Sequence, residues 1–275
     1  MKGVIKKIVS VILNYLIQSE KGREYLYYVC LKEDLLKFYK EQPSFFDDSE
    51  KHLSKASKIL QHKFPSSINN ACVVDIGASD GRALLPVLEI IKPKKAYAFE
   101  PMQKEFKALA LFAKKHEDVV IPINKALGNK TGKEIIYVTQ NSGSSSLLGV
   151  EENIQDEFYK GNMEFDRKEE IEISILDNEI PDSQIVDLLK IDVQGFEKEV
   201  ILGGENTLKR TKVVILEVRN HDYYKGAVQY YQIDEMMRAR GFALYDILHM
   251  PSYHKMLKVH EWDAIYVNEG MGNTN

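Results

Sequence analysis

The hydrophobic pattern changes about 70 residues into the chain. Before that point apolar residues recur at helical spacing, as in residues 23–40 and 50–64, where Asp48 and Ser49 offer a cap, so this part predicts helices only. From residue 71 onward, short apolar runs at 71–77, 95–100 and 119–127 alternate with helical patterns at 84–91 and 106–113. This strand-helix order predicts a parallel sheet covered by helices.

The second half of the chain continues the alternation after an interruption. A turn at 128–130 leads to a strand at 134–139, a Ser/Gly loop at 141–149, an acidic stretch predicted to be helical to about Lys160 and a strand at 170–176. We interpret this middle part as an insertion. The remaining strands and helices bring the expected core to about seven strands: strands at 185–193, 213–218, 242–248 and 263–268, and helices at 197–210 and 230–240.

These patterns divide the chain into a helical segment at 1–66, an α/β domain at 67–270 and a tail at 271–275. Residues 4–17 form an amphipathic helix that is too short to span a bilayer, with lysines on one side and aliphatic residues opposite. It could pack on its own domain, on a dimer partner or on a membrane surface. No small-residue cleavage site follows it, so we expect a cytoplasmic protein, with contact at the inner face of the membrane as an alternative.

Composition excludes several classes of function. The 275 residues include 37 basic and 41 acidic side chains, a net charge of -4, which gives no electrostatic footprint for nucleic acid. The two cysteines, Cys30 and Cys72, lack the spacing of a zinc site or a disulfide framework. A reducing compartment is therefore expected.

A glycine-containing loop directly follows the first predicted strand. Asp75, Gly77, Ser79 and Gly81 stand in an Asp-x-Gly-x-x-x-Gly spacing where a doubly wound sheet binds its ligand. A dinucleotide fingerprint would need a glycine at the position of Ser79, so a smaller nucleoside ligand fits better. Glu100 ends the second strand, where a carboxylate can accept hydrogen bonds from two ribose hydroxyls.

Several motifs together resemble the FkbM family of S-adenosylmethionine-dependent methyltransferases. They are VVDIGASDG at 73–81, AFEP at 98–101, NKALG at 124–128, the Ser-rich loop and DLLKIDVQGFE at 187–197, and the likeness runs from about Cys72 to Val267. The resemblance implies a class I methyltransferase fold of α/β, Rossmann-like type: a seven-stranded, mostly parallel sheet flanked by helices. It also implies methyl transfer to a hydroxyl of a sugar, glycan or natural-product acceptor. The N-terminal helical segment is not covered.

The resemblance also implies a cofactor site. Asp75, Gly77, Ser79 and Gly81 would surround the methionine part, Glu100 the ribose, and the stretch containing Asn124 and Ala126 the adenine. Ser146 lies in the loop that the family places over the cofactor, although a plain flexible hairpin loop would have the same composition.

Candidate catalytic residues follow two later strands. Asp192 ends a strand next to strand one and faces the pocket, where it could bind the cofactor's ammonium group, lie near the sulfonium or orient the acceptor hydroxyl. Glu217, His221 and Asp222 close the next strand or follow it, and His221 is the candidate base, with Glu217 or Asp222 as alternatives. A divalent metal held by Asp192, Glu217 and Asp222 is a further alternative without a continuous signature.

Other positions remain ambiguous at this level. Lys190 is expected to be structural or exposed at an edge, and Trp262 either fills the core or stacks on a sugar ring. Two other functions compete with the methyltransferase: an NAD-dependent oxidoreductase, disfavoured by the missing glycine, and a non-catalytic or membrane-adsorbed scaffold.

Overall fold

The structure is a computed structural model that describes residues 49–151, 163–220, 223–249 and 261–271. Several predicted features lie outside these ranges: the helices at 4–17 and 23–40, the acidic stretch to about Lys160, the residues His221 and Asp222, and most of the tail at 271–275. The compact unit that contains the sheet spans residues 48–275. No helix within the described ranges has both the length and the apolar character needed to cross a membrane.

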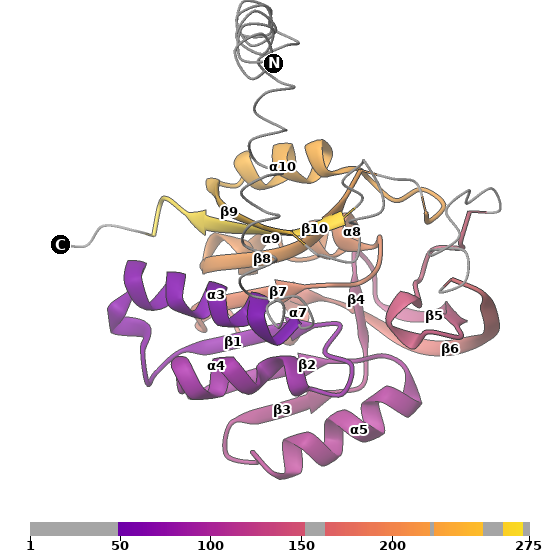
Figure 1. Cartoon of the computed structure of the whole chain (residues 1–275), viewed down its shortest axis with the longest axis horizontal. Helices are drawn as coiled ribbons and strands as arrows, with labels where there is room; N and C mark the ends of the chain where they lie inside the picture. Colours follow the sequence, from indigo (N-terminus) through magenta and orange to yellow (C-terminus); the bar gives the residue numbers. More distant parts are fainter. Residues whose placement is uncertain (1–48, 152–162, 221–222, 250–260, 272–275) are drawn as a thin grey trace, which may run out of the picture. The chain divides into compact units, whose positions relative to one another are not determined.

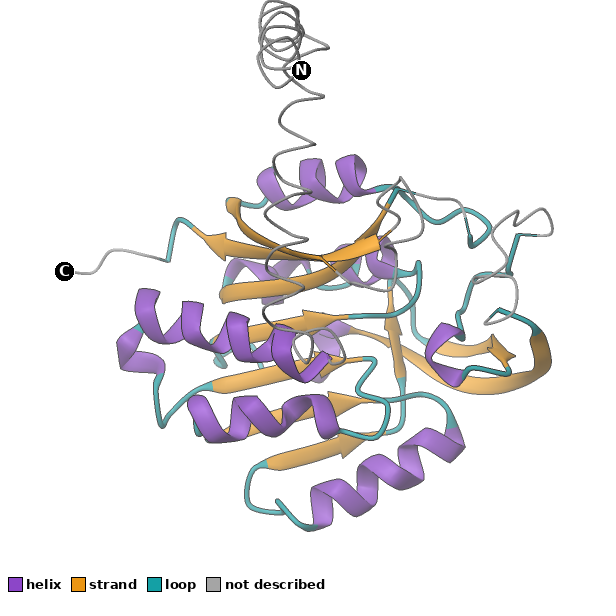
Figure 2. Cartoon of the chain, viewed as in Figure 1, coloured by secondary structure: helices purple, strands orange, loops and turns teal. Residues whose placement is uncertain are grey.

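Seven strands form one sheet in the order β3-β2-β1-β7-β8-β10-β9 (Figures 1 and 2). Strands β3, β2, β1, β7 and β8 pair in parallel, whereas β10 runs antiparallel to β8 and β9. This confirms the predicted seven-stranded, mostly parallel sheet. The strands are β1 Cys72–Ile76, β2 Lys95–Phe99, β3 Val120–Ile123, β7 Val186–Ile191, β8 Thr211–Arg219, β9 Phe242–His249 and β10 Glu261–Asn268.

Helices cover both faces of this sheet (Figure 1). Because side chains alternate along a strand, Val73 of β1 packs in the cluster with the helices on one face and Val74 in the cluster on the other. The first face is covered by α3 Ser49–Lys63, α4 Leu85–Ile90 and α5 Gln103–Lys114, and the second by α8 Glu197–Leu202, α9 Glu205–Lys209 and α10 Tyr230–Arg238. Thus α3, which the sequence places in the N-terminal helical segment, packs on the sheet itself.

The interrupting segment forms a second, three-stranded sheet in the order β4-β6-β5. The single strand expected at 119–127 is divided at Asn124 and Lys125: β3 stays in the large sheet, and β4 pairs in parallel with β6 in the small one. The bounds are β4 Ala126–Gly128, β5 Gly132–Thr139 and β6 Phe165–Ile175, with short helices η2 Pro65–Ser67, η3 Arg82–Leu84, η4 Ser142–Ser144 and α7 Leu176–Glu179. The change of sheet brings the small sheet beside the carboxyl ends of β1 and β2.

The prediction of a single helix at 197–210 is wrong, because this segment forms two helices, α8 and α9. Gly203 and Gly204 separate them at a point of close packing. A Cβ on Gly203 would lie 1.8 Å from the backbone oxygen of Gly128, and a Cβ on Gly204 would lie 2.8 Å from the Leu176 side chain. The break therefore joins the two sheets through backbone contact that leaves no space for side chains.

We expect Gly203→Ala to lower the free energy of unfolding by about 1–3 kcal/mol or more, because backbone must move to admit the methyl group. Chemical denaturation with circular dichroism measures this. Gly149→Ala is the matched control, since the nearest atom to its Cβ would be Lys225 Cδ at 3.6 Å. Equal stability of the two variants would show that the α8–α9 junction is not tightly packed.

Candidate active site

One pocket lies at the carboxyl ends of β1, β2 and β7, where the strand order reverses, and the small sheet closes its other side. Both the glycine loop after β1 and the loop after β7 contribute to its wall. Of the residues predicted to bind a cofactor, six line this pocket: Gly77, Ser79, Glu100, Ala126, Ser146 and Asp192. The other three, Asp75, Gly81 and Asn124, are not among the residues that line it.

The loop after β1 is shaped by left-handed backbone at Gly77 and Ser79, with φ of 81° and 50°. A Cβ on Gly77 would lie 1.9 Å from the backbone oxygen of Asp192, so only glycine allows the two loops to meet. The backbone amide of Asp192 also donates to Ile76 O at 3.0 Å. The two loops that bear the predicted site residues are thus joined at their bases.

Glu100 is buried at the end of β2, and backbone holds both of its carboxylate oxygens. Oε2 accepts from the Ser79 amide at 3.0 Å and Oε1 from the Met102 amide at 2.9 Å. Burial raises the pKa of Glu100 to about 7, although these two hydrogen bonds favour the ionised form. Each oxygen retains a further lone pair for a ligand hydroxyl.

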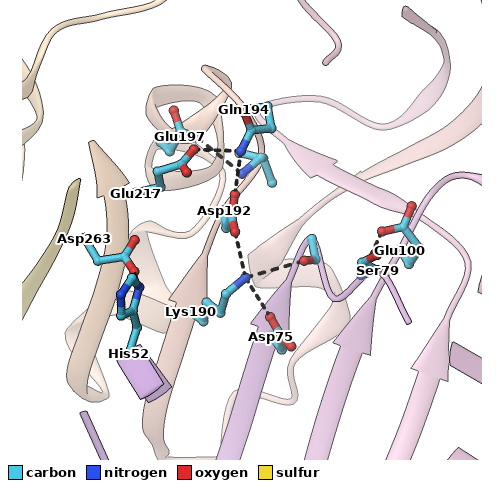
Figure 3. Close-up of polar contacts among 12 residues, drawn as sticks. His52, Asp75, Ser79, Glu100, Lys190, Asp192, Gln194, Glu197, Glu217 and Asp263 are labelled. Atoms are coloured by element: carbon cyan, nitrogen blue, oxygen red, sulfur yellow. Dashed lines mark hydrogen bonds and ion pairs between the residues drawn. The ribbon is translucent and has the colours of Figure 1, made fainter. Parts of the chain in front are cut away.

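Lys190 is the residue on which the centre of the site is built. It lies on the central strand β7 with a 9% exposed side chain, so the expectation of an edge position is wrong and the structural role holds. Its Nζ lies 3.1 Å from Asp192 Oδ2 and 3.4 Å from Asp75 Oδ1 (Figure 3). The ammonium group therefore stands between two carboxylates.

The three charges shift one another's ionisation. Burial would lower the pKa of Lys190, but Asp192 and Asp75 outweigh it and raise that pKa above its usual value. Burial tends to raise the pKa of Asp192, yet Lys190 and Gln194 hold it below the usual range. For Asp75, which is fully buried, burial prevails over Lys190 and the pKa is raised. The pocket thus presents an ionised Asp192.

A polar network extends from Asp192 to β8. Gln194, held at φ 54°, donates from Nε2 to Asp192 Oδ1 at 2.9 Å and to Glu217 Oε2 at 2.7 Å. Buried Arg219 donates to the same Glu217 oxygen at 2.7 Å. Burial and the charges of Asp192 and Glu261 raise the pKa of Glu217 well above its usual value. Glu217 thus does not line the pocket itself, and it orients Gln194, which does.

The Ser-rich loop is tied to the loop after β7. The Ser146 hydroxyl donates to Gln194 O at 2.6 Å and accepts from the Leu148 amide at 3.0 Å. Ser145 is buried beside it, and its Oγ accepts from the Thr139 amide at 3.1 Å. These serines form a fixed wall of the pocket, in contrast to the flexible loop that was the alternative.

Two predicted cofactor residues have packing roles in the structure. A Cβ on Gly81 would lie 2.6 Å from the Phe112 ring, so this glycine admits α5 to the sheet. Asn124 donates from Nδ2 to Glu100 O at 2.8 Å and to Pro101 O at 2.9 Å, which fixes the backbone at the end of β2. Trp262 is buried in the core beside Tyr230, and this confirms the core interpretation.

Sequence reasoning missed Lys190 and Gln194, although both stand in the DLLKIDVQGFE motif. The alternation of side chains along β7 could have placed Lys190 beside Asp75, given the neighbouring positions of the two strands. Of the three ligands of the alternative metal site, only Asp192 and Glu217 lie within the described residues. Among those residues, no three His, Cys, Asp or Glu side chains gather to hold an ion. Asp192 and Glu217 are instead held by Lys190, Gln194 and Arg219.

Comparison with known proteins decides the family. The model of the methyltransferase FkbM domain matches residues 75–244, more than half of the chain. The chain belongs to the FkbM methyltransferase family. Its fold is accordingly the class I methyltransferase fold that the sheet order describes.

Individual relatives of this FkbM methyltransferase domain are distant. It is 23% identical over 168 residues to the 2-O-methyltransferase NoeI of Sinorhizobium fredii, a match that covers 56% of this chain and 65% of NoeI, less than two thirds of that relative's length. A crystal structure of methyltransferase FkbM from Methylobacillus flagellatus has a TM-score of 0.48 at 12% identity, covering 72% of this chain and 44% of that one. A SAM-dependent methyltransferase from Aquifex aeolicus gives 0.41 at 12% identity, covering 83% and 97%.

We expect Lys190→Met to lower the free energy of unfolding by about 3–5 kcal/mol at neutral pH, because Asp75 and Asp192 then share a buried site without a cation. Both folded-state carboxyl pKa values rise in this variant, so its deficit grows as pH rises through them and shrinks below them. Denaturant titrations at a series of pH values measure this. Lys133→Met, which removes an exposed ion pair with Glu170, is the control and should change stability by less than about 1 kcal/mol at every pH. A deficit independent of pH would contradict the role of Lys190.

Proposed function

We propose that this protein is an S-adenosylmethionine-dependent O-methyltransferase that acts on a hydroxyl of a sugar, glycan or related natural-product acceptor. Membership of the FkbM methyltransferase family supports methyl transfer. The observation that carries the proposal is the pocket, in which Gly77, Glu100 and Asp192 meet at the point where the strand order reverses.

The residues present fit a nucleoside cofactor. Glu100 offers two carboxylate oxygens to a ribose diol, and Phe99, Met102 and Leu127 give the neighbouring wall apolar surface for a base. Gly77 lets ligand atoms approach the backbone, and ionised Asp192 can accept a hydrogen bond from an ammonium group. When bound, S-adenosylmethionine supplies an electrophilic methyl group on its sulfonium.

The choice of a hydroxyl acceptor rests on weaker support. The relative NoeI is named a 2-O-methyltransferase, at 23% identity. In this chain Asp192 and Gln194 give the wall polar side chains, and buried Glu217, itself paired with Arg219, holds Gln194 from behind. Such a wall suits a polyhydroxylated acceptor better than an apolar one.

Other predictions about the whole protein concern residues outside the described ranges. His221 as base and Asp222 as a metal ligand fall on residues outside the described ranges. The cytoplasmic location, and the contact of residues 4–17 with a membrane, a dimer partner or the domain itself, are likewise proposals.

The first experiment is calorimetric titration of the full chain with S-adenosylmethionine, S-adenosylhomocysteine and NAD in parallel, repeated on Glu100→Ala. Binding of the first two, weakened in the variant, supports the proposal. Selective binding of NAD would overturn it in favour of an oxidoreductase, and binding of none would favour a scaffold. Transfer of a labelled methyl group to methyl glycosides with free hydroxyls then tests the acceptor class.

The pKa of Glu100 predicts a pH dependence of cofactor affinity. Ribose hydroxyls donate to the ionised carboxylate, so binding favours ionisation and lowers a pKa that is about 7 in the free protein. Affinity for S-adenosylhomocysteine should therefore rise by up to about tenfold from about pH 6 to 8, with release of a proton. Calorimetry in buffers of different ionisation enthalpy detects both effects. In Glu100→Gln, which keeps the shape of the side chain, the affinity should be weaker and independent of pH over this range; an unchanged slope in that variant would assign the dependence to another group.

A further inference from the structure

His52, in the first turn of α3, is a polar residue that meets the sheet. Ala56 and Leu60, one and two turns after His52, are fully buried against the sheet. At the position of His52 the helix instead meets Asp263 of β10, and His52 Nδ1 contacts Asp263 Oδ2. The two side chains are 14% and 16% exposed, so this is a nearly buried pair at the rim of the domain.

The register of the sheet explains which other groups lie on this side. Asp263 is paired with Glu217 across β10 and β8, and Asp75 with Lys190 across β1 and β7. Each of these four residues lies two positions from an apolar residue that packs on the face covered by α3. Because side chains alternate along a strand, all four side chains point toward that same face. A row of charged side chains therefore crosses the carboxyl end of the sheet, and His52 meets it at β10.

His52 and Asp263 lie on the far side of Asp192 from the cofactor loop. In Figure 3, Glu100 and Ser79 stand on one side of Asp192, and the His52–Asp263 pair stands on the other. Asp192 lines the pocket and is close enough to His52 to influence its charge. His52 and Asp263 are not among the residues that line the pocket, but they continue the polar row beyond Asp192, so an acceptor that enters on the side away from Glu100 would meet His52.

We propose that His52 is the base that removes the proton from the acceptor hydroxyl, with Asp263 holding its imidazole ring in place. This inference rests on the methyltransferase function proposed above. The contact with Asp263 fixes the Nδ1–H tautomer and leaves the lone pair of Nε2 for the substrate, as in other carboxylate–histidine pairs.

The reaction transfers one methyl group to the acceptor and removes one proton from it. The acceptor oxygen forms a bond to the methyl carbon, the bond between that carbon and sulfur breaks, and its electron pair goes to sulfur, which leaves as a neutral thioether. The proton of the hydroxyl passes to His52 Nε2 and then to solvent at the exposed edge of the pair. Asp263 stabilises the imidazolium that forms.

The surroundings of His52 give its titration a direction. Burial tends to lower the pKa of His52, but the hydrogen bond and charge of Asp263, with the charge of Asp192, raise it above 6.5 in spite of Lys190. Because a base must be neutral to act, kcat/KM should rise with pH through a value above the usual pKa of histidine.

The test compares His52→Gln with His62→Gln in the full chain, since His62 is exposed on the same helix. Glutamine at 52 can still donate to Asp263 but takes up no proton. Transfer of labelled methyl groups to a panel of methyl glycosides is followed across pH. We expect kcat to fall by about 10²–10⁴-fold in His52→Gln, with loss of the rising limb, unchanged affinity for S-adenosylhomocysteine and unchanged melting temperature. His62→Gln should match the original protein.

A second variant separates catalysis from a structural tie between α3 and β10. In Asp263→Asn the charge that raises the pKa of His52 is lost, so the rising limb of kcat/KM should move to lower pH while kcat falls. A purely structural pair would lower the melting temperature without moving the limb. A normal kcat and an unchanged rise of kcat/KM with pH in His52→Gln would overturn the proposal. Loss of that rise in His221→Gln but not in His52→Gln would also overturn it.

A measurement that needs no acceptor keeps this proposal distinct from the proposed function. Histidine ring signals of the full chain, followed by NMR with and without S-adenosylhomocysteine, should show His52 titrating above 6.5, falling in Asp263→Asn and responding to the ligand, whereas His62 does not respond. One outcome separates the two proposals: the ligand binds and His52 behaves in this way, but no glycoside is methylated. That outcome contradicts the proposed acceptor class and supports the assignment of His52. A His52 that titrates at or below the usual pKa of histidine and ignores the bound ligand overturns the assignment, whatever the acceptor.

Discussion

The contact on which this site depends is the buried ammonium group of Lys190 between the carboxylates of Asp75 and Asp192. Two like charges at adjacent strand ends would repel one another and would be costly to bury. With Lys190 between them, β1 and β7 can end side by side with an ionised Asp192 facing the pocket. The lysine thus allows one edge of the sheet to be both part of the core and a polar binding surface.

The same arrangement orders the loops that follow these strands. Asp192 is held from one side by Lys190 and from the other by Gln194, and Gln194 is in turn held by Glu217 and by the hydroxyl of Tyr224 at 3.0 Å. Because the polar groups of Asp192 and Gln194 are already paired within the protein, the wall is formed before a ligand arrives. Preorganisation of this kind reduces the ordering cost of binding.

The sequence was sufficient to predict those site residues whose position is set only by the end of a strand. Gly77, Glu100 and Asp192 follow recognisable strands, and parallel strands of a doubly wound sheet end at one edge, so their meeting could be inferred. For Lys190 the choice between a structural role and an edge position stayed open, because its partner Asp75 is 115 residues away and only the strand order makes them neighbours. His52 was overlooked because it precedes the region of family likeness, and nothing in a helical pattern shows which strand the helix will cover.

The backbone contact between Gly77 and Asp192 has a consequence for how the site responds to its ligands. With no side chain separating them, and with the Asp192 amide bound to Ile76 O, the two loops cannot be displaced independently. A molecule that orders the loop after β1 also fixes the position of the carboxylate after β7, on the side where a second molecule would enter. The two halves of the site are thus tied together through main chain, by this close contact and by the hydrogen bond from Asp192 to Ile76.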